Sequence, residues 1–129
     1  FLIYPATAFN LGYRSTSEKR YGNGEYFLKI NSEEEGLNYY FEDPTDADSP
    51  YASPLYADDL RNLPPACFIS AECDPLLDQA LMYAAKLEDA GVSVEYHLYK
   101  GMVHAFINRP LQKTFEAFNT IIEAMPKTE

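Results

Sequence analysis

An aspartate and a histidine in the second half of the chain have the types and surroundings of an acid–base pair. Asp74 follows an apolar segment at residues 66–71, and His104 follows an alternating segment at residues 92–99 and a glycine, Gly101. A carboxylate that accepts from one ring nitrogen of a histidine fixes the tautomer and stabilises the imidazolium that forms when the other nitrogen takes a proton. Alone, Asp74 would be a helix cap and His104 a surface residue, but their shared position after two expected strands favours the pair.

Three segments are expected to form the strands that position this pair. Residues 1–4 are a continuous apolar and aromatic run that Pro5 ends, which is typical of a strand buried on both faces. Residues 66–71 predict a second buried strand, and the alternation over 92–99 predicts a third, followed by a tight turn at Gly101. In a parallel sheet the loops after adjacent strands lie side by side, so Asp74 and His104 should meet.

Two helices are expected between and after these strands. Asp74 and Pro75 predict an N-cap and a first helical position, and Gly91 predicts the end of the same helix. Pro110 predicts the start of a last helix, which Pro126 ends. The order of strands and helices indicates an α/β fold with right-handed crossovers. The predicted apolar face of the last helix consists of Leu111, Phe115, Phe118, Ile121, Ile122 and Met125.

The length of 129 residues predicts one domain, with a largely irregular excursion at 6–65 before the strand–helix–strand–helix unit at 66–125. Within the excursion, residues 6–24 have no period and predict a loop. Ser32 and Glu35 form a capping box that predicts a short helix up to about residue 41. Residues 43–65 are rich in proline and aspartate, and predict an ordered loop with one helical turn near 57–60.

The charge and hydropathy of the chain exclude several kinds of partner. A formal net charge of −10 and the absence of a lysine or arginine cluster argue against nucleic acid and anionic membranes, because both require a basic surface. No apolar run is long enough to span a membrane, and no signal peptide is visible. We therefore expect a cytoplasmic protein. Because the sequence begins inside an apparent strand and without a methionine, we also expect a fragment of a longer protein.

The two cysteines, Cys67 and Cys73, are expected to be reduced and buried. Their separation along one straight strand would be roughly 20 Å, which is too far for a disulfide. No second pair of cysteine or histidine residues has ligand spacing, so neither a metal site nor a cofactor is predicted.

Four motifs resemble the C-terminal part of the hormone-sensitive-lipase-like esterases, which are α/β-hydrolases. The similarity is strong over about residues 49–107, and residues 2–5 resemble the strand that follows the family's nucleophile helix. The chain departs from the family at Leu77, where arginine is common, and at Ala105, where glycine is common. The motifs are SPYASPL at 49–55, LPPA at 63–66, SAECDPLLD at 70–78 and YKGMVHAF at 99–106.

The resemblance implies that Asp74 is the triad acid and His104 the general base of an esterase for short or medium acyl esters. The family's serine lies in a Gly-x-Ser-x-Gly elbow and its oxyanion hole in a His-Gly-Gly loop, and this sequence contains neither. The chain alone is therefore expected to be inactive, and its serines lack the context of a substitute nucleophile.

Other residues near the pair have possible supporting roles. Met102, Val103 and Phe106 flank His104, so each is either a substrate-binding residue or ordinary packing. Asp78 either supports the histidine loop through hydrogen bonds or complements the helix dipole. His97 is interpreted as a structural or surface residue.

Two other functions stay open from the sequence. One is a truncated, non-catalytic α/β module for binding or assembly, and the other is the end of a peptidase-type α/β-hydrolase, which also carries an aspartate followed by a histidine. A strand at residues 1–4 without a neighbour would present an unpaired apolar edge. We therefore expect the chain to self-associate through that edge.

Overall fold

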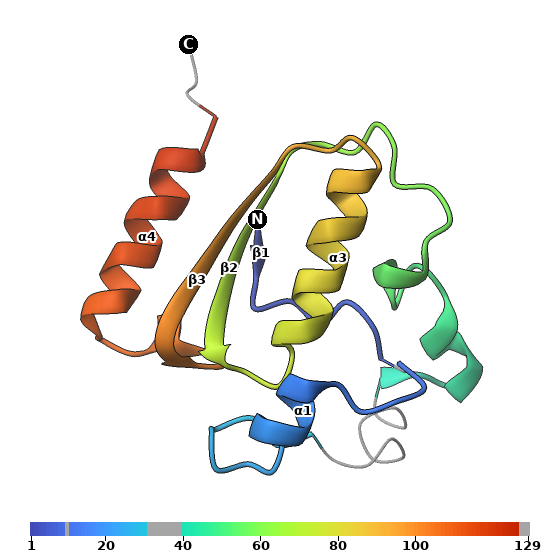
Figure 1. The fold of residues 1–129 in the computed structure, drawn as a ribbon, viewed down its shortest axis with the longest axis horizontal. Coiled ribbons are helices and arrows are strands. Elements are labelled where there is room, and N and C mark those ends of the chain that lie inside the picture. Colours follow the sequence, from blue (N-terminus) through green and yellow to red (C-terminus); the bar gives the residue numbers. More distant parts are fainter. Residues whose placement is uncertain (10, 31–39, 127–129) are drawn as a thin grey trace.

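A computed structural model describes residues 1–9, 11–30 and 40–126. Its three strands form one parallel sheet in the order β1-β2-β3, with helices packed against it (Figure 1). The predicted α/β class is thereby confirmed. The elements are β1 (Leu2–Ile3), α1 (Thr16–Tyr21), β2 (Ala66–Cys73), α3 (Leu77–Asp89), β3 (Val94–Val103) and α4 (Gln112–Ala124), with 3-10 turns at Pro44–Asp48, Pro54–Tyr56 and Phe106–Asn108.

β2 is the central strand, and its two faces carry the two halves of the core. Phe68 packs with α3 residues such as Leu87 on one face. Ile69 packs with Phe106 and with Ala117 of α4 on the other. Successive side chains of a strand point to opposite faces, so α3 and α4 cover opposite sides of the sheet. The continuous apolar run of β2 follows from its burial on both sides.

β1 is shorter and less buried than the sequence predicts. It spans two residues, both only partly buried, rather than four residues buried on both faces. The reason is its position, because β1 pairs with β2 alone and forms an edge of the sheet. The apolar run therefore predicted the strand, and its expected edge position is confirmed, but it did not predict the short length or the partial burial.

β3 continues through the residue at which the sequence predicts a turn. Gly101 lies inside the strand at φ 73°, a conformation that favours glycine. The register slips here: Ala71 pairs with Tyr99, but Cys73 pairs with Val103. Gly101 thus belongs to a bulge, which re-aims the end of a strand. Its N–H donates to the Glu72 carboxylate at 2.7 Å, which compensates for the interrupted ladder.

α3 begins later than predicted. Its first residue is Leu77, and Asp74 is not its N-cap. Instead, the Asp74 carboxylate accepts from the backbone N–H of Leu76 at 2.9 Å in the turn that precedes the helix. The predicted end is confirmed, since the helix stops at Asp89 and Gly91 follows at φ 81°.

The excursion at 6–65 contains more local structure than predicted. Residues 16–21 form α1, whose N-cap Ser15 accepts from the N–H of Glu18. The 3-10 turns at 44–48 and 54–56 each begin with a proline, and 57–60 is not helical. Proline fixes its φ at a value that suits the first turn of a helix, so the helical turns form after Pro44 and Pro54 and not at 57–60, where one was predicted. The helix predicted from Ser32 falls mainly on residues 31–39, outside the described ones.

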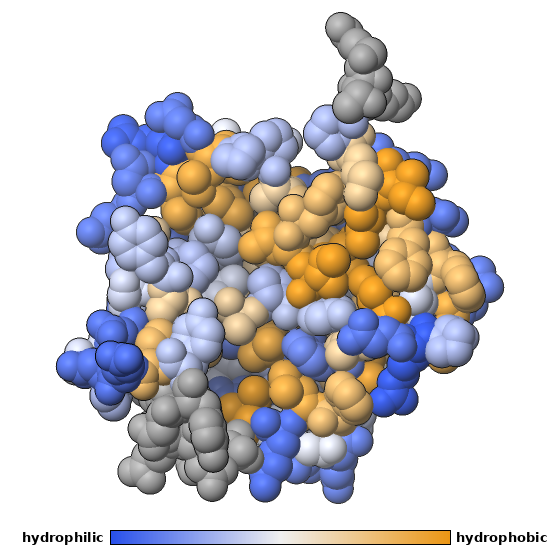
Figure 2. All heavy atoms as spheres, turned by 180° about the vertical axis from the view of Figure 1, so that it is seen from behind, coloured by the Kyte–Doolittle hydropathy of each residue, from blue (hydrophilic) through white to orange (hydrophobic). Residues whose placement is uncertain are grey.

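α4 buries only a small part of the face that the sequence predicts. Thr114 and Ala117 are buried, whereas Phe115, Phe118 and Ile122 are exposed. Ile121 of the predicted face is partly buried, and it packs together with Ala124 against the core cluster that contains Ala117. Seen from behind, the molecule carries a broad hydrophobic area on this side (Figure 2).

Neither cysteine of the chain forms a disulfide. Cys67 is buried, while Cys73 is only partly buried, which corrects the prediction of two buried thiols. Among the described residues, no helix is long and apolar enough to cross a membrane.

Candidate active site

Asp74 and His104 are in contact at the carboxyl ends of β2 and β3. Asp74 Oδ2 lies 2.9 Å from His104 Nδ1. Its other oxygen, Oδ1, accepts from Leu76 N–H, so both carboxylate oxygens are used. Asp74 is 2% exposed, and the His104 side chain is 19% exposed. The carboxylate is thus held in a buried position, whereas the imidazole reaches the surface.

This geometry can hold a histidine ready to take a proton. Because Asp74 accepts at Nδ1, the proton of a neutral His104 is placed on Nδ1 and the lone pair on Nε2. No described residue hydrogen-bonds to Nε2. The ring can therefore act as a base toward a group that approaches from solvent, and the buried carboxylate would stabilise the resulting imidazolium.

The loop that carries His104 is fixed on both sides. The bulge at Gly101 precedes it, and Ala105 follows it in the left-handed conformation at φ 61°. Thr114 of α4 donates to the backbone carbonyl of Phe106 at 2.9 Å, both residues being buried. The end of β3 and the start of α4 thus hold the histidine from two directions.

Tyr4 is a third contributor that the sequence did not single out. It follows β1, and its ring lies 4.7 Å from the His104 ring between centroids. Its N–H donates to the Ile69 carbonyl at 2.7 Å, and its φ is 36°, which is unusual for an aromatic residue. Burial, and secondly the charge of Asp74, raise the pKa of the Tyr4 hydroxyl. The only sequence signal was its place at the end of a strand, directly before Pro5.

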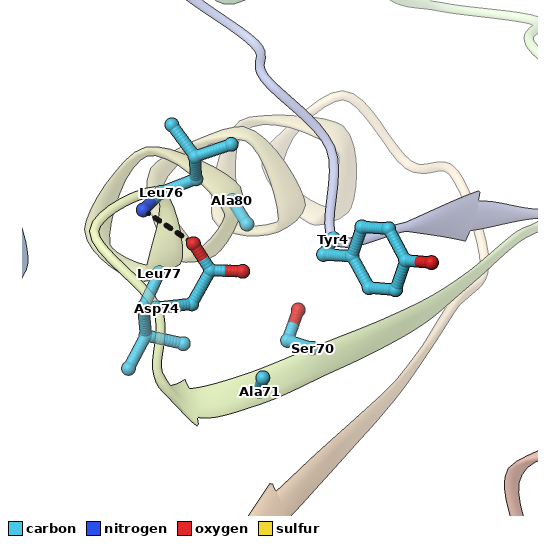
Figure 3. A pocket seen from close by; sticks show the side chains of 7 residues that line it. All are labelled: Tyr4, Ser70, Ala71, Asp74, Leu76, Leu77 and Ala80. Atoms are coloured by element: carbon cyan, nitrogen blue, oxygen red, sulfur yellow. Dashed lines mark hydrogen bonds between the residues drawn. The ribbon is translucent and has the colours of Figure 1, made fainter. Parts of the chain in front are cut away.

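A shallow pocket lies beside Asp74, between the end of β2 and the first turn of α3 (Figure 3). Tyr4 and Asp74 reach it from two different strands, and Ser70 lies between them. The Ser70 hydroxyl accepts from the Tyr96 hydroxyl at 2.8 Å. The seven lining residues are Tyr4, Ser70, Ala71, Asp74, Leu76, Leu77 and Ala80.

The predicted substrate-binding residues are not among those that line this pocket. Phe106 is fully buried and packs against the rings of Tyr99 and Tyr4, so its observed contacts are those of a core residue. Met102 and Val103 are partly buried on β3. A substrate-binding role for Met102 and Val103 stays a prediction.

Asp78 forms its hydrogen bonds with α1. Its carboxylate accepts from Ser17 N–H at 2.8 Å, and its own N–H donates to the Ser17 hydroxyl at 3.1 Å. The two residues tie α1 to the start of α3, and Asp78 lies in the first turn of that helix, where its charge complements the helix dipole as one of the two predicted roles requires. His97 lies on β3 and pairs with Glu95 at 2.8 Å, remote from His104.

Comparison with known proteins gives these features a context. The model of the α/β hydrolase fold family matches residues 1–108. An arylesterase from Saccharolobus solfataricus is 41% identical over 114 residues, which are 88% of this chain and 36% of that protein. An ethyl acetate hydrolase from Pseudomonas putida is 36% identical over 126 residues, or 96% of this chain and 39% of that protein.

The solved structures agree with the sequence matches. An esterase from the archaeon Pyrobaculum calidifontis superposes with a TM-score of 0.87 at 40% identity, covering 95% of this chain and 39% of that one. The chain thus spans between 36% and 39% of the length of these relatives. The resemblance to esterases is confirmed, and the chain belongs to the α/β-hydrolase fold family.

Proposed function

We propose that this chain supplies the acid and the base of a serine carboxylic-ester hydrolase. The observation that carries the proposal is the contact of 2.9 Å between Asp74 Oδ2 and His104 Nδ1 at the carboxyl ends of adjacent parallel strands. The names of the relatives, arylesterase and ethyl acetate hydrolase, support an ester substrate rather than a peptide. The name ethyl acetate hydrolase also supports a short acyl chain.

In the proposed reaction, a serine hydroxyl attacks the ester carbonyl while His104 Nε2 takes the serine proton. The resulting imidazolium, stabilised by Asp74, returns the proton to the leaving alcohol and leaves an acyl-serine. Water then attacks the acyl group while His104 takes its proton; the bond to the serine oxygen breaks, His104 returns the proton to that oxygen, and the carboxylic acid is released. Because the 129 residues contain no Gly-x-Ser-x-Gly elbow, the serine and the oxyanion donors must come from outside this sequence.

The chain alone is therefore proposed to be inactive, and this is directly measurable. Purified residues 1–129 should hydrolyse p-nitrophenyl acetate no faster than the buffer does, because a triad without its nucleophile loses nearly all of its rate. A steady turnover that His104→Ala abolishes would contradict the proposal.

A chimera tests the acid and base directly. This chain would replace the aligned segment of the Saccharolobus solfataricus arylesterase, which keeps that enzyme's own remaining residues. The chimera should hydrolyse p-nitrophenyl acetate, and Asp74→Ala or His104→Ala should each lower kcat by about 10⁴-fold or more.

The matched control for the chimera is Asp89→Ala, an exposed aspartate at the end of α3, which should retain full activity. Circular dichroism would establish that every variant is folded. A folded His104→Ala chimera with undiminished kcat would show that the base lies elsewhere.

A further inference from the structure

Three side chains with metal-binding chemistry meet on one face of the sheet, far from the candidate active site. Cys67, Glu95 and His97 each offer one ligand atom, and these atoms all lie within 4.8 Å of one another. Cys67 is at the start of β2, about seven residues or roughly 23 Å of strand before Asp74. The cluster is therefore at the opposite end of the strands from His104.

The sheet register creates this cluster. Cys67 pairs directly with Glu95 across β2 and β3, and Ile69 pairs with His97. Residues two apart on a strand share a face, so Glu95 and His97 project on the same side as Cys67. The strand ladder fixes all three backbones, and a rigid support is what a metal site requires.

We propose that Cys67, Glu95 and His97 form a binding site for a divalent transition metal ion, with zinc the natural occupant. Zinc accepts sulfur, imidazole nitrogen and carboxylate oxygen together, and three protein ligands leave one position for water. This inference is independent of the proposed esterase function, because it uses neither Asp74 nor His104.

The distances suit this chemistry after small side-chain movements. In a tetrahedral zinc site, bonds of about 2.0 to 2.3 Å place ligand atoms roughly 3.5 Å apart. The separations of up to 4.8 Å must therefore close by roughly 1 Å, while the Glu95–His97 contact of 2.8 Å must open slightly. Glu95 is 59% exposed and His97 31% exposed, so both side chains have room to rotate.

The balance of charge also favours a cation. A buried thiolate beside a carboxylate is unfavourable alone, but a divalent ion neutralises both. On binding, Cys67 releases its thiol proton to solvent, and His97 Nε2 donates its lone pair to the metal in place of its contact with Glu95.

The experiment is titration of the purified chain with Co²⁺, which reports its ligands by absorption. We expect a thiolate-to-cobalt charge-transfer band in the near ultraviolet and the intense visible bands of tetrahedral cobalt, both abolished when Zn²⁺ displaces the cobalt. Cys67→Ser should lose the charge-transfer band. The matched control is Cys73→Ser, which removes the other free thiol of the chain and should retain it.

A second pair of variants keeps the test decisive if Cys67→Ser does not fold. Glu95→Gln and His97→Gln replace partly exposed side chains, and each should weaken cobalt affinity at least about tenfold, since even outer-shell partners of a ligand are worth that much. Absence of the charge-transfer band from the folded chain at saturating Co²⁺ would overturn the proposal. So would a band that survives in Cys67→Ser, or affinities unchanged in both glutamine variants.

Discussion

At the scale of single residues, the feature that matters is the use of both oxygens of Asp74. One oxygen contacts His104 and the other accepts from the Leu76 backbone, so the carboxylate cannot rotate without breaking one of these bonds. A carboxylate held in this way orients the imidazole as well as stabilising its charge. The Tyr4 ring packs against the same His104 imidazole.

The first prediction concerns the tautomer of His104. In the purified chain, nitrogen NMR at a pH where the ring is neutral should place its proton on Nδ1. Asp74→Asn should raise the population of the Nε2-protonated form, because the amide can donate to Nδ1 where the carboxylate could only accept. Asp78→Asn is the control, since Asp78 contacts Ser17 and should leave the His104 spectrum unchanged. A predominantly Nε2-protonated ring in the unaltered chain would refute this assignment.

At the scale of elements, the ends of the three strands decide where the site residues lie. Tyr4 directly follows β1, Asp74 follows β2 and His104 follows the bulged β3, and the parallel pairing brings these ends together. Two of the ends have an unusual backbone conformation: Tyr4 adopts positive φ after β1, and Gly101 and Ala105 adopt it on either side of His104. Such conformations cost free energy and persist because the surrounding contacts hold them.

The second prediction tests the strain at Ala105. The left-handed conformation costs a non-glycine residue about 1 to 2 kcal/mol, and glycine avoids this cost. Against this, a glycine lowers the stability of the folded chain by about 0.4 to 1 kcal/mol, because it raises the entropy of the unfolded chain. Ala105→Gly should therefore stabilise the chain by roughly 0.5 to 1 kcal/mol. Urea unfolding would show a higher midpoint with an unchanged slope.

The control for this substitution has the opposite sign. Ala85 is exposed within α3, where its replacement by glycine should cost about 1 kcal/mol of stability. If Ala105→Gly and Ala85→Gly destabilised the chain equally, the conformation at Ala105 would carry no strain.

At the scale of the whole molecule, apolar surface remains outside the core at two places. β1 has one free edge within the described sheet, and Phe1 beside it is 51% exposed. α4 presents a second apolar surface, in which Phe115 is 56% exposed. Both surfaces are apolar, but of the two the β1 edge also offers unpaired backbone groups to which another strand can add.

The third prediction is that the chain self-associates through the β1 edge. Sedimentation velocity should show oligomers whose fraction rises with concentration, and Phe1→Lys should lower that fraction because charges block strand addition. Phe115→Lys is the matched control, with a phenylalanine of similar exposure on α4, and it should have little effect. A cleanly monomeric chain, or oligomers that only Phe115→Lys disrupts, would rule out the β1 edge.

The fourth prediction concerns alkaline pH. Burial raises the pKa of Tyr83, and it also raises that of Tyr96 despite the opposing hydrogen bond to Ser70. Above about pH 10 the unfolded chain loses phenol protons that the folded chain keeps, so the free energy of unfolding falls as pH rises. Urea midpoints measured between about pH 8 and 11 should decline.

Substitution of single tyrosines identifies the source of this decline. Tyr83→Phe should make the decline shallower, because the variant lacks a phenol that ionises more easily in the unfolded chain than in the folded one. Tyr51→Phe, at a fully exposed position, should leave it unchanged. Equal slopes in all three chains would mean that buried phenols do not control alkaline stability.

The sequence alone predicted the features that depend on residues close together along the chain. The apolar run of β2, the helix before Gly91 and the motifs around Asp74 and His104 predicted the α/β fold, the family and the contact between the two residues. The fold and the contact follow from periodicity, a turn residue or a strand end, which are properties of neighbours along the chain, whereas the family follows from the resemblance of the motifs.

Only the tertiary structure decided which residues from different strands and helices lie in contact. It shortened β1 to two residues, made Gly101 part of a bulge, buried the side of α4 that carries Thr114 and Ala117, and brought Tyr4 to His104. It also joined Cys67 to Glu95 and His97 through strand register. These outcomes depend on pairing between residues that are far apart in sequence, and a spacing along one strand carries no information about register with the next.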